Sequence, residues 1–585
     1  MKAFLSGNEA IAVGAYENGV LFAAGYPGTP STEILEKIAE YKKIDAQWMS
    51  NEKVALDAAL GASLAGTRSL VAMKHVGLNV ASDTLMTLSY TGVNAGLVIV
   101  TADDPGMHSS QNEQDNRNYA KFAKIPLLEP SNSQEAKDDV KLALKISEEF
   151  DTPVLIRITT RIAHSRSIVK LSRRRRIFSG GKIFVRHPEK YTMIPINARK
   201  RHEFVEHRLK RLKEFSEKTG CNKIGWGKND IGIIASGVSY QYAKEACPEA
   251  SFLKLGMSYP LPESLIRKFA KKSSRLYIVE ELDPFLEEQI KAMGIKGKGK
   301  KVFPLTGELN PDLVREKLCK KNTKKNSGAI ARQPFLHPLS FCAGCSYAGL
   351  FYILRKLKTV VIGDIGCYAL SALPPLSTMD TCVSMGSSIG IALGMGKVSR
   401  SSFRKNLIAV IGDSTFIHSG ITPLISVVYN KGTTTVIILD NQTTAMTGRQ
   451  NHPGTGITLK GEKTSKIDYK QLAKALGIKR VKIINCYDLK NIKVVIRQEL
   501  LSSQPSVLIA KNPCLLLTRR KKFVSFKILD SKCIKCRECL MLGCPAIFLK
   551  EHQRPYINSQ VCTGCALCKQ VCSRNAIKEL DIEGK

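Results

Sequence analysis

The sequence lacks the long apolar segments of a membrane protein and the apolar leader of a secreted one. Across its 585 residues, no apolar run approaches the roughly 20 residues that cross a bilayer. Glu9 and Glu17 stand where a signal peptide would be apolar. We therefore expect a soluble, cytoplasmic protein with no membrane partner.

Acidic residues are also scarce, since 51 Asp and Glu face 88 Lys and Arg and leave a formal charge of +37. Such a charge alone favours nucleic-acid binding, but the sequence has no Walker loop or other nucleic-acid motif. The excess is concentrated, because residues 161–223 hold 19 Lys and Arg against 5 acids and residues 291–326 hold 11 against 3. A basic iron-sulfur protein that acts on nucleic acid stays an alternative, which a gel-shift at physiological salt would test.

The composition indicates several folded α/β domains. Hydrophobic residues make up 43% and charged residues 24%, which excludes a disordered chain. Short apolar runs that alternate with helical composition predict doubly wound parallel sheets, whose ligands lie at the carboxyl ends of the strands. The expected order is an α/β domain at 1–165, a basic connector at 166–228, a smaller middle α/β domain at 229–320, a linker at 321–337, another α/β domain at 338–518 and a cysteine-rich domain at 523–585.

The cysteine-rich end carries eight of the 17 cysteines, spaced as ligands of two [4Fe-4S] clusters. Three cysteines spaced by two residues wrap one face of a cubane, and the fourth of each run reaches the other cluster. One cluster is therefore expected on Cys533, Cys536, Cys539 and Cys572, and the other on Cys562, Cys565, Cys568 and Cys544. A zinc module is the alternative. The segment resembles bacterial two-cluster ferredoxins, with two departures. Four residues in place of three separate Cys539 from Cys544, and Ser573 stands where the second proline would be.

Polar residues follow two apolar runs, Leu407–Ile411 and Thr435–Asp440, in the 338–518 domain. Gly412, Asp413 and Ser414 follow the first, and Asn441 lies 28 residues after Asp413. Two strand ends with oxygen ligands can hold Mg²⁺ and, through it, a diphosphate. The spacing resembles the thiamine diphosphate signature, although Ser414 replaces a glycine. That resemblance implies the Asp413 and Asn441 side chains and the Thr443 carbonyl as Mg²⁺ ligands, with an ordinary turn as the alternative.

Thiamine chemistry also needs a carboxyl group that hydrogen-bonds the pyrimidine ring of the cofactor from a dry pocket opposite the diphosphate site. Glu52 begins an alanine-rich helical stretch of the first domain and is the candidate. The alternative is a solvated acid in the first helical turn, where the helix dipole favours negative charge. In the same domain, the apolar run Leu21–Tyr26 leads to Thr29, an expected helix cap, and Pro30, an expected first helical residue.

Thiamine diphosphate and two [4Fe-4S] clusters in one chain resemble the 2-oxoacid:ferredoxin oxidoreductases. Within them, the domain order is similar to the alpha subunits of indolepyruvate:ferredoxin oxidoreductase along almost the whole chain. The stretches that carry this resemblance are GYPGTPSTEIL at 25–35, SNEKVALDAALGAS at 50–63, KHVGLNVASD at 74–83, DDPGMHSSQNEQDNR at 103–117, GDIGCYALSALPPL at 363–376 and LDNQTTAMTGRQNHPGTG at 439–456.

The resemblance implies oxidative decarboxylation of aryl 2-oxo acids such as indolepyruvate with CoA, giving arylacetyl-CoA, CO2 and reduced ferredoxin. It implies that Thr29 touches the substrate carboxylate. Lys74, His75 and Asn79 are predicted to line the substrate or cofactor pocket, with a solvated rim as the alternative. Arg117 is expected to pair with a carboxylate, and a surface salt bridge is the equally weighted alternative.

The resemblance also implies partners. These are a separate beta subunit of about 200 residues, an assembly of two alpha and two beta chains, and an acidic ferredoxin that the basic tail attracts. Nucleic acid is not expected as a partner. Two alternatives stay open: another 2-oxo acid as substrate, or a non-redox thiamine decarboxylase, which would leave the ferredoxin-like tail without a task.

A third, proximal cluster is implied by four further cysteines of the 338–518 domain. Cys342, Cys345, Cys367 and Cys514 resemble the proximal-cluster ligands of pyruvate:ferredoxin oxidoreductase. Alternatively, Cys367 and Cys514 are small core residues, and Cys342 and Cys345 only shape the cofactor loop. Iron analysis separates the two, since three cubanes hold about 12 iron atoms and two hold about 8.

Overall fold

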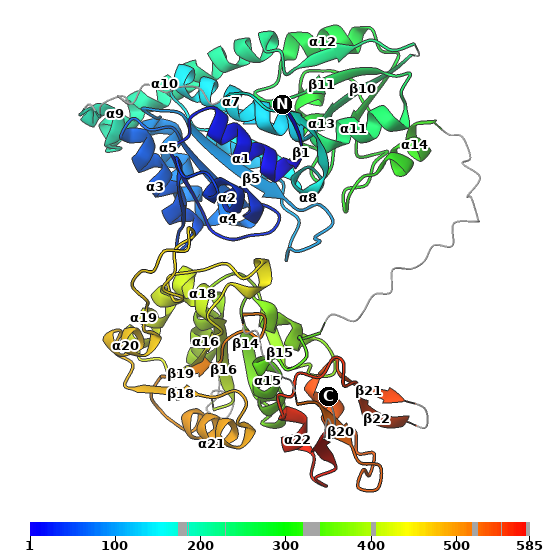
Figure 1. The fold of residues 1–585 in the computed structure, drawn as a ribbon. Coiled ribbons are helices and arrows are strands. Elements are labelled where there is room, and N and C mark those ends of the chain that lie inside the picture. Colours follow the sequence, from blue (N-terminus) through cyan, green and yellow to red (C-terminus); the bar gives the residue numbers. More distant parts are fainter. Residues whose placement is uncertain are drawn as a thin grey trace. The chain divides into compact units, whose positions relative to one another are not determined.

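The computed structural model describes residues 1–173, 184, 186–228, 230–319, 340–398, 405–517, 524–550 and 553–580 (Figure 1). The chain divides into two units, residues 1–330 and 331–585, and each is described by itself. The expected linker at 321–337 lies outside the described residues. Among the helices of the described ranges, none has the length and apolar composition needed to cross a membrane.

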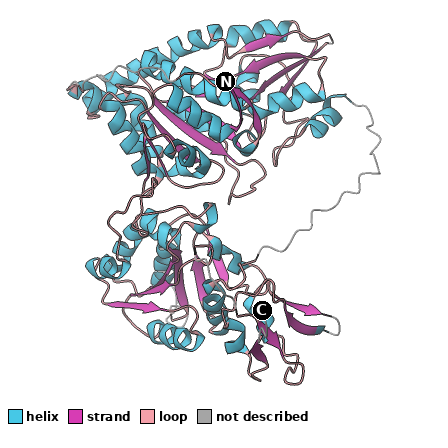
Figure 2. Ribbon diagram, in the orientation of Figure 1, coloured by secondary structure: helices cyan, strands magenta, loops and turns pink. Residues whose placement is uncertain are grey.

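The first unit is built on a seven-stranded sheet (Figure 2). Its strands are β2 (Phe22–Gly25), β3 (Asp45–Trp48), β4 (Ser69–Lys74), β5 (Leu97–Asp103), β6 (Leu127–Leu128), β7 (Val154–Thr159) and β12 (Met257–Tyr259). The order is β12-β6-β7-β5-β4-β2-β3, and only β12 runs antiparallel to its neighbour. Every residue of β4, β5 and β7 is buried, as expected of parallel strands covered on both faces.

Helices pack around this sheet. They are α1 (Gly7–Glu17), α2 (Thr32–Ala39), α3 (Glu52–Leu64), α4 (His75–Val80), α5 (Ser82–Thr91), α6 (Arg117–Ala123), α7 (Ser133–Phe150) and α8 (Thr160–His164). Helix α1 packs on α7, and α3 packs on β2 and β4. A separate pair of antiparallel strands joins β1 (Lys2–Ser6) to β8 (Arg166–Lys170), so the start of the expected connector belongs to this domain.

A second, four-stranded sheet forms the middle domain. Its strands are β9 (Lys223–Gly225), β10 (Ile231–Ser236), β11 (Ser251–Leu255) and β13 (Arg275–Val279). The order is β13-β10-β11-β9, parallel except for β9. Strand β9 lies within the expected connector, which therefore contributes strands to two sheets. The helices of this domain are α11 (Gly237–Ala246), α12 (Glu263–Lys271), α13 (Phe285–Ala292) and α14 (Pro311–Cys319).

The basic connector contains the short helix α9 (Pro188–Tyr191) and the long helix α10 (Pro195–Lys218). Two of its cations hold α10 against the first domain. Arg201 donates to the Tyr90 carbonyl at 2.6 Å, and the buried Arg208 donates to the Ser89 hydroxyl at 3.0 Å. Part of the charge of this stretch therefore serves packing within the protein.

The second unit centres on a six-stranded, fully parallel sheet. Its strands are β14 (Val360–Gly363), β15 (Met379–Cys382), β16 (Leu407–Gly412), β17 (Thr435–Asp440), β18 (Arg480–Ile484) and β19 (Ser506–Lys511), in the order β15-β14-β16-β17-β19-β18. One core contains residues of α15 (Ser346–Lys356) and α21 (Leu489–Leu500), and another contains residues of α16 (Ser387–Val398), α19 (Ile421–Tyr429) and α20 (Tyr469–Ala475).

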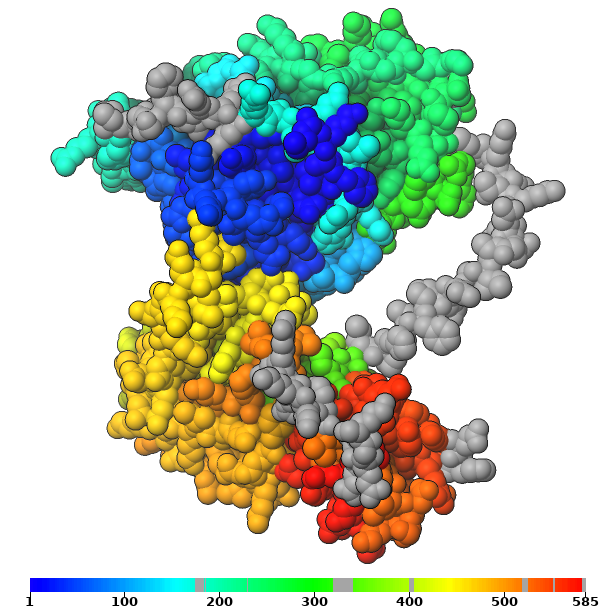
Figure 3. Space-filling view, in the orientation of Figure 1, coloured from blue at the N-terminus to red at the C-terminus, as the bar shows by residue number. Residues whose placement is uncertain are grey.

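The cysteine-rich tail packs on the first of these two cores, which includes Cys539, Leu542 and Cys568. It contains two pairs of short antiparallel strands: β20 (Phe526–Ile528) with β23 (Ile577–Glu579), and β21 (Ile547–Lys550) with β22 (Arg554–Ile557). The helical turns are Glu538–Leu542 and α22 (Leu567–Val571). In the space-filling view the tail, in orange and red, covers one side of the second unit (Figure 3).

Candidate active site

The residues predicted to hold Mg²⁺ and its diphosphate meet at the carboxyl ends of two neighbouring strands. Strands β16 and β17 pair in parallel with Gly412 opposite Leu439, so the residues that follow each strand are adjacent. Asp413 begins α18 (Asp413–Thr415), and its carboxylate accepts hydrogen bonds from the backbone N–H groups of Ser414 and Gln442 at 2.8 and 2.9 Å. The Asn441 side-chain oxygen accepts the Thr443 N–H at 3.0 Å. Asp413, Ser414, Asn441 and Thr443 are all buried.

The donor set fits a hard cation. Burial and the nearby Asp413 carboxylate raise the pKa of Asp440, because two buried acids repel one another unless a positive charge lies near. No three His, Cys, Asp or Glu side chains of the described residues converge as ligands of a single ion. Asp413 supplies one carboxylate, and Mg²⁺ takes one or two carboxylates and completes its octahedron with phosphate oxygens and waters.

His452 belongs to this site and was missed by the sequence reasoning. It is buried, and its Nε2 lies 3.4 Å from the Asp413 carboxylate without a hydrogen-bond partner among the described residues. A buried ring nitrogen without a partner is costly unless a ligand satisfies it. The residue lies in the stretch 439–456 that carried the family resemblance, but nothing in its spacing identified it.

Four cysteines from distant parts of the chain line one cavity of about 100 Å³, which we call cavity A. It is bounded by Cys342, Cys345, Cys367 and Cys514, and Asn441 lines it as well. Burial, together with the neighbouring Cys514 and Cys342, raises the pKa of the Cys367 thiol to about 11. The structure thus brings together all four residues expected to hold a third cluster, beside a predicted Mg²⁺ ligand.

Two further cavities gather the cysteines of the tail. Cavity B is lined by Cys544, Cys562, Cys565 and Cys568, and also by Cys342 and Cys345. Cavity C is lined by Cys533, Cys536, Cys539 and Cys572. In both, three cysteines of one run meet the last cysteine of the other run. The donor chemistry therefore fits a cubane in each cavity, since four thiolates are the ligand set of [4Fe-4S].

Glu52 begins α3 in the first unit, directly after its cap Asn51, whose side chain accepts the Val54 N–H at 2.9 Å. Only 5% of Glu52 is exposed, so it is not a solvated acid. A Cβ atom on Gly77 would lie 2.6 Å from Glu52 Oε1, so the carboxyl group packs directly on the backbone of α4.

Thr29 and Pro30 precede the helix that they were expected to begin. Helix α2 starts at Thr32 after Ser31, because residues 28–31 close a tight turn in which the Ser31 N–H and hydroxyl both donate to the Gly28 carbonyl. Thr29 is half-buried. Its carbonyl accepts the Ser109 hydroxyl at 3.3 Å, which places the loop 103–117 against this turn.

The three residues predicted from the 74–83 stretch all contact the loop 103–117. Lys74 donates to the Ser109 carbonyl at 2.7 Å, and burial lowers its pKa to about 8. His75 Nε2 lies 3.2 Å from the Asn112 side-chain oxygen, and Asn79 exchanges two hydrogen bonds with Gln114. Lys74 and His75 are buried and are not a solvated rim.

Arg117 is fully buried, so its ion pairs are not a surface salt bridge. It contacts the Asp115 carboxylate at 2.5 Å and the Glu280 carboxylate at 2.8 Å, and it donates to the carbonyls of Glu281 and Asp283. Since Glu280 and Glu281 follow β13, Arg117 joins the first sheet domain to the middle domain.

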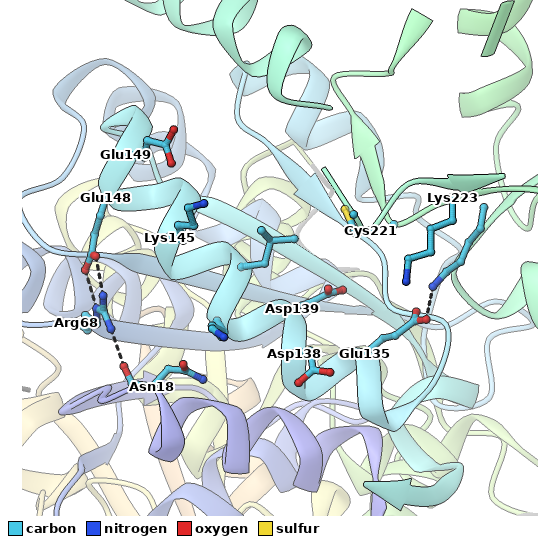
Figure 4. A pocket seen from close by; sticks show the side chains of 15 residues that line it. Asn18, Arg68, Glu135, Asp138, Asp139, Lys145, Glu148, Glu149, Cys221 and Lys223 are labelled. Carbon is cyan, nitrogen blue, oxygen red and sulfur yellow. Dashed lines mark hydrogen bonds and ion pairs between the residues drawn. The ribbon is translucent and has the colours of Figure 1, made fainter. Parts of the chain in front are cut away.

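A large charged groove, drawn in Figure 4, is lined by none of the predicted site residues. Its volume is about 920 Å³, and five acids face five bases along it. Arg68 pairs with Glu148 at 2.6 Å, and Lys254 pairs with Glu135. Burial raises the pKa of Asp139 in its wall. Because positive and negative charges balance, the groove offers no particular attraction to an anionic substrate.

Comparisons with known proteins define the class first. Residues 13–209 match the family described as pyruvate flavodoxin/ferredoxin oxidoreductase, thiamine diphosphate-binding. Residues 364–510 match the C-terminal binding domain of thiamine pyrophosphate enzymes. These two matches cover the domain with Glu52 and the domain with Asp413 and Asn441. The protein is therefore a thiamine diphosphate-dependent 2-oxoacid oxidoreductase.

Full-length relatives define the family. The chain is 39% identical to the indolepyruvate oxidoreductase subunit IorA of Archaeoglobus fulgidus, over 99% of this chain and 97% of the relative. It is 38% identical to IorA of Pyrococcus horikoshii over the same shares. The chain belongs to the family of indolepyruvate:ferredoxin oxidoreductase alpha subunits. A solved 2-oxoglutarate:ferredoxin oxidoreductase from Magnetococcus marinus matches 55% of this chain and 65% of its own, with a TM-score of 0.46 and 17% identity.

Proposed function

We propose that this chain is the catalytic subunit of a cytoplasmic enzyme that oxidatively decarboxylates aryl 2-oxo acids, with indolepyruvate as the type substrate. One 2-oxo acid, one CoA and two oxidised ferredoxins would give one arylacetyl-CoA, one CO2, two reduced ferredoxins and a proton. The names of the relatives support the aryl substrate. The alternative within the family is another 2-oxo acid.

One observation carries the redox part of this proposal: cavity A is lined both by four cysteines and by Asn441. A cluster held there would lie beside the Mg²⁺-diphosphate site. Cavity B shares Cys342 and Cys345 with cavity A, and cavity C lies in the same tail. Electrons would thus have a short route from the substrate to the basic tail. A non-redox thiamine decarboxylase would leave all three cysteine sets without a task.

Each predicted residue has a defined role in this proposal. Bound thiamine diphosphate would supply the electron sink for decarboxylation. Asp413, Asn441 and the Thr443 carbonyl would hold its Mg²⁺, close to the turn formed by Gly412 and Ser414. Glu52 would hydrogen-bond its pyrimidine ring from a buried position, and Thr29 would bind the substrate carboxylate.

We also infer the partners. A separate beta subunit of about 200 residues would complete an assembly of two alpha and two beta chains. An acidic ferredoxin would dock on the tail, where residues 519–585 carry 14 Lys and Arg against 6 acids. The relatives are named as subunits, which supports a multi-subunit enzyme.

The test is an anaerobic preparation of the chain with its beta subunit, assayed with a panel of aryl and aliphatic 2-oxo acids, CoA and ferredoxin. We expect about 12 iron atoms per alpha chain and ferredoxin reduction that requires CoA and is fastest with arylpyruvates. An iron content of only about 8 atoms per alpha chain would exclude a cluster in cavity A. Decarboxylation without ferredoxin reduction would overturn the redox proposal, and preference for an aliphatic 2-oxo acid would overturn the aryl substrate.

A further inference from the structure

His452 lies in a closed turn that determines which of its ring nitrogens carries the proton. The Thr455 N–H and hydroxyl both donate to the His452 carbonyl at 2.8 Å. Within this turn, the Gly454 N–H donates to His452 Nδ1 at 3.1 Å. A ring nitrogen that accepts a hydrogen bond has no proton of its own, so the proton of the ring is on Nε2.

The ring has little room to turn away from this arrangement. His452 is buried, and a Cβ atom on Gly454 would lie 2.8 Å from His452 Cε1. The same Cβ atom would lie 2.0 Å from the hydroxyl oxygen of Tyr469, the first residue of α20. The backbone at Gly454 therefore packs directly on the ring, and the direction of the Nε2–H is set by the fold.

This Nε2–H lies beside the Asp413 carboxylate without a hydrogen bond to it. His452 Nε2 is 3.4 Å from Asp413 Oδ2, but it makes no hydrogen bond with any residue that the structure describes. The same carboxylate oxygen already accepts the Gln442 N–H at 2.9 Å. Because an unpaired buried donor is destabilising, its position beside Asp413 indicates a ligand that accepts a hydrogen bond there.

The proton on Nε2 also decides the chemistry of that ligand. A ring nitrogen that carries a proton has no free electron pair in the ring plane, so it cannot ligate Mg²⁺. It can donate to an anion, and charged acceptors form the stronger hydrogen bonds. The diphosphate whose Mg²⁺ would be held by Asp413 and Asn441 supplies such oxygens at this place.

We propose that His452 is a cofactor-binding residue whose Nε2–H donates a hydrogen bond to a diphosphate oxygen of thiamine diphosphate. The inference deepens the proposed function and rests on it, since it needs the diphosphate beside Asp413. The histidine holds the diphosphate directly, whereas Asp413 and Asn441 hold it through the metal. Loss of the Nε2–H should therefore weaken the cofactor even when Mg²⁺ is saturating.

Two substitutions separate the two nitrogens of the ring. His452→Asn places an amide oxygen near the position of Nδ1, so it keeps an acceptor for the Gly454 N–H and removes the Nε2 donor. His452→Gln places an amide N–H near the position of Nε2, so it keeps a donor and removes the Nδ1 acceptor. Each variant is thus the control for the other.

The test measures affinity in the complete, anaerobically purified enzyme after removal of its cofactor. Isothermal titration calorimetry at saturating Mg²⁺ gives the Kd of thiamine diphosphate, and inorganic diphosphate is then used as a competitor. We expect His452→Asn to raise the Kd of thiamine diphosphate at least about tenfold, the effect of losing one hydrogen bond to a charged group. Inorganic diphosphate should weaken by a similar factor, and His452→Gln should stay within about threefold of wild type.

Three results would overturn the role of His452. Wild-type affinity in His452→Asn would show that the Nε2–H is not used. Equal losses in both variants, or a loss only in His452→Gln, would show that the ring serves the turn at Gly454. A loss in His452→Asn for thiamine diphosphate but not for inorganic diphosphate would place the contact away from the phosphates.

The wild-type enzyme separates this proposal from the proposed function. If it binds no thiamine diphosphate in the presence of Mg²⁺, the proposed function fails together with the role of His452. If it binds the cofactor tightly and His452→Asn binds it equally well, only the role of His452 fails.

Discussion

Glu52 combines an acidic side chain with a buried position at the first turn of α3. A carboxyl group normally stays in water at such a place, where the helix N-terminus favours it without enclosing it. Here the backbone at Gly77 comes so close that no side chain fits between them. The cost of burying this acid argues for a task, which we take to be contact with the thiamine pyrimidine ring.

Replacing Glu52 by glutamine should lower kcat at least about 100-fold, because the amide cannot share a proton with the cofactor as a carboxyl group does. Substrate-dependent reduction of a dye measures the rate, and bound thiamine diphosphate should be assayed in the same sample. Asp57→Asn is the matched control, since Asp57 is an exposed acid on the same helix. Equal rates for Glu52→Gln and wild type would remove Glu52 from the mechanism.

At the scale of elements, the end of β13 forms a charged seam with the first sheet domain. Arg117 binds Glu280 there, and the carboxyl group of Glu281 accepts the Leu309 N–H at 3.0 Å. Burial raises the pKa of Glu281 to about 7. Ionisation of this seam is therefore coupled to the packing of the two domains.

This seam makes stability depend on pH. Because the folded pKa of Glu281 lies above the unfolded value of 4.5, the folded state keeps a proton that the unfolded chain loses. The contribution of Glu281 to the free energy of unfolding is fully present below pH 4.5 and is lost as the pH rises to about 7. The loss amounts to about 3 kcal/mol. Glu281→Gln keeps the bond to Leu309 and should remove this part of the pH dependence.

Urea unfolding at pH 5 and pH 7.5 measures the effect in the full chain. Tryptophan fluorescence reports on the first unit, because both tryptophans, Trp48 and Trp226, lie in it. Glu36→Gln, which removes an exposed acid of the same unit, should retain the wild-type pH dependence. If Glu281→Gln also retains the wild-type pH dependence, the proposed role of Glu281 is wrong.

At the scale of the whole molecule, the charge of +37 divides into parts with different uses. Arg201 and Arg208 hold α10 to the first domain. The tail has an excess of 8 positive charges and would stay basic with the about −4 that the two proposed clusters would add in their oxidised state. Such a surface attracts an acidic protein and speeds its encounter at low salt.

Raising the ionic strength from about 20 to 300 mM should slow ferredoxin reduction about tenfold, because screening removes the long-range attraction. Reduction of a neutral dye by the same enzyme should change little. Stopped-flow rates at subsaturating ferredoxin measure both. The same salt dependence for ferredoxin and dye would exclude electrostatic steering.

The sequence by itself determined the features that local chemistry sets. The apolar run Thr435–Asp440 is a strand with those bounds, and the apolar run Leu407–Ile411 lies within β16. Asp413 and Asn441 could be paired because parallel neighbouring strands end at the same edge of a sheet. The eight tail cysteines could be divided into two sets of four because the ligand spacing of a cubane is nearly local, and each set lines one cavity.

Only the tertiary structure decided which distant side chains meet. It buried Arg117 between two domains, placed His452 beside Asp413, and put Gly344 of the loop Cys342–Cys345 against Thr563 of the tail. These contacts join residues from separate strands and loops, and a sequence carries no periodic signal for such pairs. Their neighbours follow from strand order and side-chain packing, which exist only once the sheets have formed.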